Sequence, residues 1–88
     1  MIKVEIKLNR NKINKEKRYT IDHCSNYVKE LFKYYDFEGI ETKDNSLVFY
    51  GNNDEGDFRK FANIISFLKD SDIFQYIEKI VGSNIPCL

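Results

Sequence analysis

The residues best suited to chemistry in this chain are Asp22, His23 and Cys24, which include its single histidine. A cysteine beside a histidine suggests the nucleophile and the base of a cysteine hydrolase. Neighbouring residues at the start of a helix point about 100° apart, however, and catalytic pairs normally converge from separate elements. We therefore expect His23 and Cys24 to point in different directions and to form no catalytic pair.

Other sequence motifs that would support catalysis or metal binding are missing. None of the serines lies in a nucleophile elbow, and no glycine pattern resembles a phosphate-binding loop. Cys24 and Cys87 are far apart and belong to no CxxC pair, so we expect no zinc site. Residues 52–57, NNDEGD, lack the alternating ligands and the closing glutamate of a calcium loop. We expect a protein that is not an enzyme and that uses no cofactor or metal.

Residues 9–18, NRNKINKEKR, are strongly basic in a chain whose formal net charge is zero. Five bases surround one acid, Glu16: Arg10, Lys12, Lys15, Lys17 and Arg18. Either register of a hairpin with residues 2–8 would put charge against the apolar side of that strand, so we expect a basic loop or an edge strand. The alternative is a functional contact with phosphate or with an acidic partner. No aromatic residues alternate with these bases, but five phosphate contacts would still give salt-sensitive binding to nucleic acid.

Acidic side chains gather later in the chain. Residues 1–33 contain 9 basic and 4 acidic side chains, whereas residues 34–88 contain 5 and 10, so the two parts carry net charges of +5 and −5. Turns and helix starts attract Asp and Glu for structural reasons. The alternative is an acidic ridge that binds a basic groove as a nucleic-acid mimic would. The residues of this ridge would be Glu41, Asp44, Asp54, Glu55 and Asp57.

The hydrophobic pattern predicts the elements that position these residues. Residues 2–8, IKVEIKL, alternate apolar and polar side chains, which is typical of a half-buried strand. Apolar residues at helical spacing predict helices over 23–37 and 57–69. The same spacing predicts a third, shorter helix, or a bent continuation of the second, over 72–82.

A β-hairpin is expected between the first two helices, in the letters GIETKDNSLVFYG, with its turn at Asp44 and the asparagine after it. A two-residue loop puts three apolar side chains on the core face: Ile40, Leu47 and Phe49. Val48 and Tyr50 then point to the opposite face. Because an outermost strand also leaves an unpaired edge, a symmetric homodimer that buries Val48 and Tyr50 is a further possibility.

The order strand, helix, hairpin, helix predicts an α+β domain, a two-layer sandwich with helices over one face of a small mixed sheet and a short C-terminal helix. Eighty-eight residues form one domain. No apolar run approaches the roughly 20 residues of a membrane span, and we expect a cytoplasmic protein that begins at Met1. Lys, Ile, Asn, Phe and Tyr supply 44 of the 88 residues. Their AT-rich codons suggest a low-GC bacterium, a phage or another mobile element.

Three stretches of the sequence share a known order: MIKVEIKL, then a helix, then DNSLVFYG leading directly into NDEGDFRKFANIISFL. This order, over residues 1–69, resembles that of DinI-type proteins, small regulators of the DNA-strand-exchange recombinase. The resemblance implies DNA mimicry by acids at the start of the second long helix. Here the corresponding acids are Asp54, Glu55 and Asp57, and Arg59 and Lys60 follow them at once. The basic segment and residues 72–82 have no counterpart in that family.

The leading interpretation is a non-enzymatic binding protein from a mobile element or phage, which inhibits or modulates a recombinase or a defence nuclease through its acidic ridge. One alternative is a small nucleic-acid-binding protein that uses residues 9–18. Another alternative is a self-associating module. The expected partners are accordingly a protein with a basic groove, weakly bound nucleic acid or a second copy of the chain, and no membrane.

Overall fold

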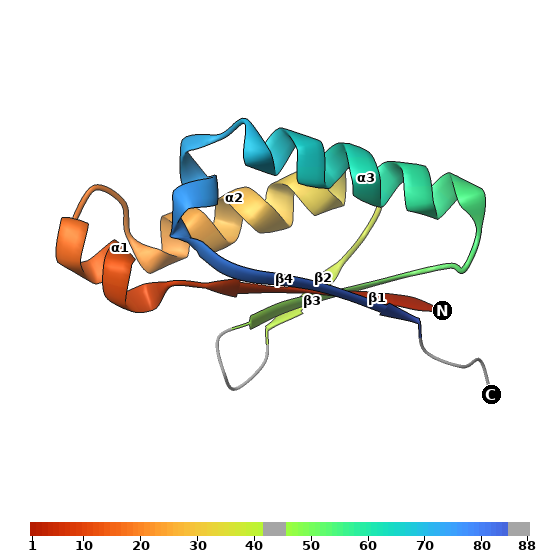
Figure 1. Ribbon diagram of the computed structural model, residues 1–88, viewed down its shortest axis with the longest axis horizontal. Helices are drawn as coiled ribbons and strands as arrows, with labels where there is room; N and C mark the ends of the chain where they lie inside the picture. Colours follow the sequence, from red (N-terminus) through yellow and green to blue (C-terminus); the bar gives the residue numbers. More distant parts are fainter. Residues whose placement is uncertain (42–45, 85–88) are drawn as a thin grey trace.

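The computed structural model describes residues 1–41 and 46–84. The elements, in chain order, are β1 (Ile2–Leu8), α1 (Arg10–Glu16), α2 (Ile21–Tyr34), β2 (Gly39–Glu41), β3 (Ser46–Gly51), α3 (Glu55–Lys69), the 3-10 helix η1 (Asp72–Tyr76) and β4 (Ile77–Asn84). The strands form one antiparallel sheet in the order β2-β3-β1-β4. Helices α2 and α3 lie over one face of this sheet, and no described helix covers the other (Figure 1). The α+β class and the two-layer arrangement are thus confirmed.

The core lies between the sheet and the two long helices. The alternation of β1 buries Ile2, Val4, Ile6 and Leu8 and leaves the lysines and the glutamate between them toward the uncovered face. The ring of Phe32 in α2 stacks on that of Phe49 in β3, with centroids 3.7 Å apart. Capping defines where the long helices begin, because the Thr20 hydroxyl accepts the His23 N–H and the Asp54 carboxylate accepts the Asp57 N–H.

The helices expected over 23–37 and 57–69 correspond to α2 and α3. The expected hairpin corresponds to β2 and β3, and its turn at Asp44 lies outside the described residues. The expected register is wrong, because Ile40 lies opposite Val48 and therefore shares its face instead of that of Leu47 and Phe49. Glu41 takes the place opposite Leu47, where its carboxylate accepts hydrogen bonds from α2.

The sheet is fully antiparallel, so the expectation of a mixed sheet is wrong. The reason is that β1 lies beside β3, the second strand of the hairpin, and runs antiparallel to it, whereas β2 pairs only with β3. The edge strand β4 also runs antiparallel to β1.

The helix expected over 72–82 is also wrong. The chain forms η1 and then the edge strand β4, whose register against β1 shifts between Lys7 and Leu8. This β-bulge lets Ile77 and Ile80, which are three residues apart, both pack against the core. A spacing of three between buried residues is typical of a helix, so the sequence pattern predicted a helix where the chain forms a bulged strand.

Residues 9–18 form neither a loop nor an edge strand, because most of them belong to α1. The Asn9 side chain caps this helix by accepting the Lys12 N–H, and Ile13 is its single buried residue. The helix ends at Lys17, whose φ of 54° lies in the left-handed region. One apolar residue gives no periodicity, so the hydrophobic pattern carried no sign of this helix.

Candidate functional site

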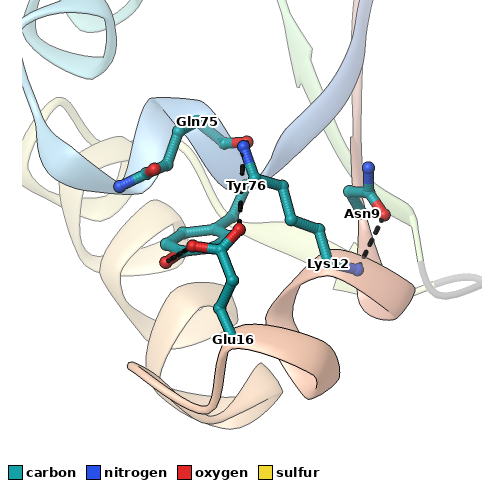
Figure 2. Close-up of polar contacts among 5 residues, drawn as sticks. All are labelled: Asn9, Lys12, Glu16, Gln75 and Tyr76. Carbon is teal, nitrogen blue, oxygen red and sulfur yellow. Dashed lines mark hydrogen bonds and ion pairs between the residues drawn. The ribbon is translucent and has the colours of Figure 1, made fainter.

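Helix α1 is fastened to η1, which comes much later in the chain. The Asn9 N–H donates to the Tyr76 carbonyl over 2.7 Å, and the Lys12 ammonium donates to the Gln75 carbonyl over 3.2 Å. The Tyr76 hydroxyl donates to a carboxylate oxygen of Glu16 over 3.0 Å. Figure 2 shows the two side-chain bonds, one near each end of the helix. Because these contacts act at both ends, the basic segment has a fixed position on the body of the protein.

Tyr76 is the centre of this attachment. Its side chain is fully buried, in a cluster with Leu8, Ile13 and Cys24. Burial raises the pKa of the Tyr76 phenol above its ordinary value, and the hydrogen bond to the Glu16 carboxylate acts in the same direction. The hydroxyl therefore keeps its proton at neutral pH and remains a donor.

The five bases of residues 9–18 fall into two groups. Lys12 contacts the Gln75 carbonyl and lies 3.9 Å from Glu16, and Arg18 lies 3.4 Å from the Asp72 carboxylate. Within residues 1–41 and 46–84, the other three have no hydrogen-bond or ion-pair partner for their side chains: Arg10, Lys15 and Lys17. All three are exposed. They are available to a ligand without loss of an internal ion pair.

Further basic charge lies where β1 leads into α1. Lys7 and Lys79 are opposite each other in β1 and β4. Lys7 pairs with Glu78 at 3.4 Å, whereas Lys79 is exposed and has no ion-pair partner in the described chain. The end of the molecule that carries α1 is therefore its basic end.

The acids predicted to form a ridge lie in two separate places. Glu41 is opposite Leu47, near the start of β3, whereas Asp54 follows the end of β3. In Figure 1 the start of α3 accordingly lies at one end of the molecule and the start of β3 lies toward the other. Asp44 is outside the described residues. The described acids therefore do not form the continuous ridge that the sequence predicted.

Each of these described acids also has a local structural role. Asp54 caps α3, Glu55 accepts from Arg59 at 3.0 Å, and Asp57 accepts the Asn52 N–H at 2.6 Å. Such roles account for acids at a helix start without any partner molecule. The sequence showed that acidic residues gather here, but it did not show that their carboxylates accept hydrogen bonds from neighbouring residues.

Glu41 has a different set of partners, on α2. Its carboxylate accepts hydrogen bonds from Lys29 and from the Ser25 hydroxyl, the latter over 3.2 Å. The Lys29 ammonium, through its hydrogen bond and its charge, lowers the pKa of Glu41, and Ser25 adds to this effect. These contacts join β2 to α2.

No protein-family model, curated protein or solved structure matches this chain. The resemblance to DinI-type proteins therefore stays an expectation. Among the residues that the structure describes, no three His, Cys, Asp or Glu side chains are grouped to hold a metal ion. None of the described helices has the length and apolar character needed to cross a membrane.

The two residues of the predicted dimer surface lie on the face that the sequence indicated. Val48 and Tyr50 are opposite Glu5 and Lys3, on the sheet face that the helices leave uncovered. Tyr50 is 40% exposed, whereas Val48 is only 3% exposed. The homodimer itself stays a prediction.

His23 and Cys24 diverge, as expected. Cys24 is fully buried, and burial raises the pKa of its thiol. His23 is exposed and stacks on Tyr19, with ring centroids 5.0 Å apart and planes at 4°. Sequence reasoning missed this stack and the role of Tyr76. The position of Tyr19 directly after the basic segment was the one available signal.

Proposed function

We propose that this chain is a small non-enzymatic protein that binds nucleic acid through α1 and the residues directly after it. The observation that carries the proposal is the fixed position of α1 combined with three cations that have no ion-pair partner among the described residues, Arg10, Lys15 and Lys17. Cations held in place beside a phosphate backbone release its condensed counterions, and this release supplies most of the nonspecific affinity for nucleic acid.

Arg18 adds a fourth contact to this group. Its pair with Asp72 is exposed on both sides, with side-chain exposures of 56% and 65%. Exposed pairs of this kind contribute at most about 1 kcal/mol, so a phosphate can replace Asp72 at small cost. Lys12 remains bound to the Gln75 carbonyl. Three or four phosphate contacts give a slope of log K against log salt of about −3 on duplex DNA.

Inhibition of a recombinase or a defence nuclease by an acidic surface has less support. The acids that would mimic DNA are divided between two places, and Asp54, Glu55 and Asp57 already have local partners. By contrast, three cations without an ion-pair partner in the described part of the chain belong to α1 and the residue that follows it. The contacts thus favour a protein that binds the phosphates of nucleic acid over one whose acidic side chains mimic them.

Self-association is a second candidate function, and the uncovered sheet face is the observation that favours it. Tyr50 and Val81 are both 40% exposed on strands that no described helix covers from this side. Lys3 and Glu5 lie on the same face, so a second copy related by a two-fold axis could oppose unlike charges. This function would not exclude nucleic-acid binding at α1.

The test is a salt titration of binding to a labelled strand of about 20 nucleotides, single and duplex, as DNA and RNA, from about 50 mM salt upward. Lys15→Gln with Lys17→Gln should weaken binding to every sequence and make the salt slope about 2 units less steep on duplex DNA. The matched control is Lys33→Gln with Lys69→Gln, which removes the same charge from two exposed lysines without ion-pair partners among the described residues.

The control pair of lysines lies on α2 and α3, so its removal should leave the salt slope nearly unchanged. Equal effects of the two double variants would mean that only net charge matters, and would contradict a site on α1. Absence of binding by the unmodified protein at low salt would end the proposal.

A further inference from the structure

We infer that the nucleic acid is single-stranded and that one of its bases enters a hollow between α1 and the start of α2. This inference rests on the function proposed above and assigns it a ligand class. The hollow has a volume of about 420 Å³. It is lined by three apolar or aromatic residues, two cations and two neutral polar residues: Ile13, Tyr19, Ile21, Lys17, Arg18, Asn14 and Thr20.

The lining of the hollow suits a nucleotide. Pockets for small ligands have volumes of a few hundred Å³ and combine apolar walls with few polar groups. A base is flat and mainly apolar on its two faces, whereas the phosphate attached to its sugar is anionic. Apolar walls directly beside Lys17 and Arg18 therefore match the two parts of one nucleotide.

The ring of Tyr19 is held in position before any ligand arrives. His23 stacks on it at 5.0 Å, and Tyr76 meets it edge-on, with centroids 5.8 Å apart and planes at 80°. A ring fixed in this way loses little entropy when a base packs against it. Base–aromatic stacking is the main sequence-independent contact in single-strand binding.

Arg18 supplies a second planar group at the same place. Its guanidinium carbon lies 5.7 Å from the centre of the Tyr19 ring. Guanidinium planes stack on bases in complexes with unpaired RNA, and the same group binds phosphate. The exposed pair with Asp72 is weak enough to allow Arg18 to move with the ligand.

The turn after α1 brings Lys17 to the hollow. Lys17 adopts φ of 54°, and its N–H donates to the Ile13 carbonyl over 3.1 Å. The chain then continues through Arg18 and Tyr19, so that two cationic residues and one aromatic residue, consecutive in sequence, line the same hollow. In a duplex the bases are paired and stacked inside the helix and cannot enter such a space. Preference for a single strand follows.

The deciding experiment uses the unmodified protein and two strands of about 20 nucleotides with the same number of phosphates, one of them thymidine throughout and the other abasic throughout. We expect the thymidine strand to bind about fivefold more tightly or better, because stacking on an aromatic ring adds at least that much affinity per base. Contact with phosphates alone predicts equal binding of both strands.

Three results separate the inference from the function on which it rests. Equal, salt-sensitive binding of both strands would overturn the base site and leave the phosphate contacts intact. Tighter binding of duplex than of thymidine strand would also overturn it. No binding of either strand at low salt would overturn the proposed function, and the inference with it.

A variant locates the base on the protein. Tyr19→Leu should reduce the preference for thymidine over abasic strand to near onefold, with an unchanged salt slope. Tyr34→Leu is the matched control, because Tyr34 lies near the other end of α2 and is 81% exposed. A thermal melt followed by circular dichroism checks that both variants fold. If Tyr19→Leu does not fold, the comparison of the thymidine and abasic strands on the unmodified protein still tests whether a base contributes to binding. A folded Tyr19→Leu protein that kept the full preference would contradict the assignment.

Discussion

The hydroxyl of Tyr76 donates a hydrogen bond of 3.0 Å to a carboxylate oxygen of Glu16, and this bond joins two segments that are 60 residues apart. Glu16 is the only acid in the basic segment 9–18. Its role is therefore to hold the segment to the body of the protein. Because the Tyr76 side chain is fully buried, water cannot take the place of Glu16 as the acceptor of this bond unless the structure opens locally.

Tyr76→Phe removes this bond and leaves the ring in place. We expect Tm to fall by about 5 °C, because a domain of this size loses several degrees for each lost buried hydrogen bond. Hydrogen exchange of the α1 amides should speed up, since one of the side-chain contacts with η1 is gone. The control is Tyr34→Phe, which removes a hydroxyl from an exposed ring without a hydrogen-bond partner in the described chain. Unchanged protection of α1 would show that the bond does not hold the helix.

Acid should weaken the contact between β2 and α2. Lys29 lowers the folded-state pKa of Glu41 below its ordinary value of 4.5. A lowered carboxyl pKa adds stability above the unfolded-state value, and this stability is lost as pH falls through the folded-state value. Glu41→Gln should therefore be less stable than the unmodified protein at pH 7, by less than about 1 kcal/mol because the pair is exposed.

The difference between Glu41→Gln and the unmodified protein should shrink as pH falls below 4.5. Urea unfolding at a series of pH values measures it. Glu30→Gln, on the same helix as Lys29 and without an ion-pair partner among the described residues, is the control. A difference that persists unchanged at the acid end would contradict the ion pair as its source.

The acid that begins α3 should act through its hydrogen bond and not through its charge. The Asp54 carboxylate accepts the Asp57 N–H over 2.8 Å. Asp54→Asn keeps an acceptor and should be nearly neutral, whereas Asp54→Ala should cost about 1 kcal/mol in the free energy of unfolding. Chemical denaturation of the two variants distinguishes these outcomes. Equal destabilisation by both would mean that the charge at the helix start matters more than the cap.

Local patterns predicted the parts of the fold that depend on local spacing. The alternation in β1 and the apolar stripes of α2 and α3 are readable because each element buries one face against the same core. The strand β4 was not readable, since its bulge places Ile77 and Ile80 on one face at a helix-like spacing. Helix α1 was not readable either, because Ile13 is its one buried residue.

The candidate site was predictable as a group of bases, but the roles of its members were not. Lys12 and Arg18 look equivalent to Lys15 and Lys17 in sequence. What separates them is contact with Gln75 and Asp72, which are 63 and 54 residues away from their partners. Contacts over such separations follow from the packing of η1 against α1, and no spacing within residues 9–18 encodes them.

Two glycines in strands should respond to alanine in opposite ways. A Cβ at Gly51 would lie 2.6 Å from one ring carbon of Phe61 and 2.8 Å from another. Phe61 is a core residue with 5% exposure, so it cannot move aside freely. Gly51→Ala should cost about 1–3 kcal/mol in the free energy of unfolding. A Cβ at Gly82 would meet no atom within 4 Å, and Gly82→Ala should be neutral or slightly stabilising. Urea unfolding measures both, and equal effects would contradict the close packing at Gly51.

The sheet face that the helices leave uncovered presents the exposed ring of Tyr50. If two copies pack through this face, Tyr50→Lys should convert a dimer to a monomer, because it replaces an exposed ring with a charge directly opposite Lys3. Helical content should not change, since Tyr50 lies outside the core clusters. Light scattering at about 100 micromolar protein measures the mass, because weak dimers form only at such concentrations.

Tyr34→Lys is the control for that experiment, since it places the same charge on the helical layer. It should leave a dimer intact. A monomeric unmodified protein would refute self-association through this face. Unfolding of Tyr50→Lys would contradict the placement of Tyr50 on the uncovered face, because a lysine at a position that faces solvent can extend its ammonium group into water.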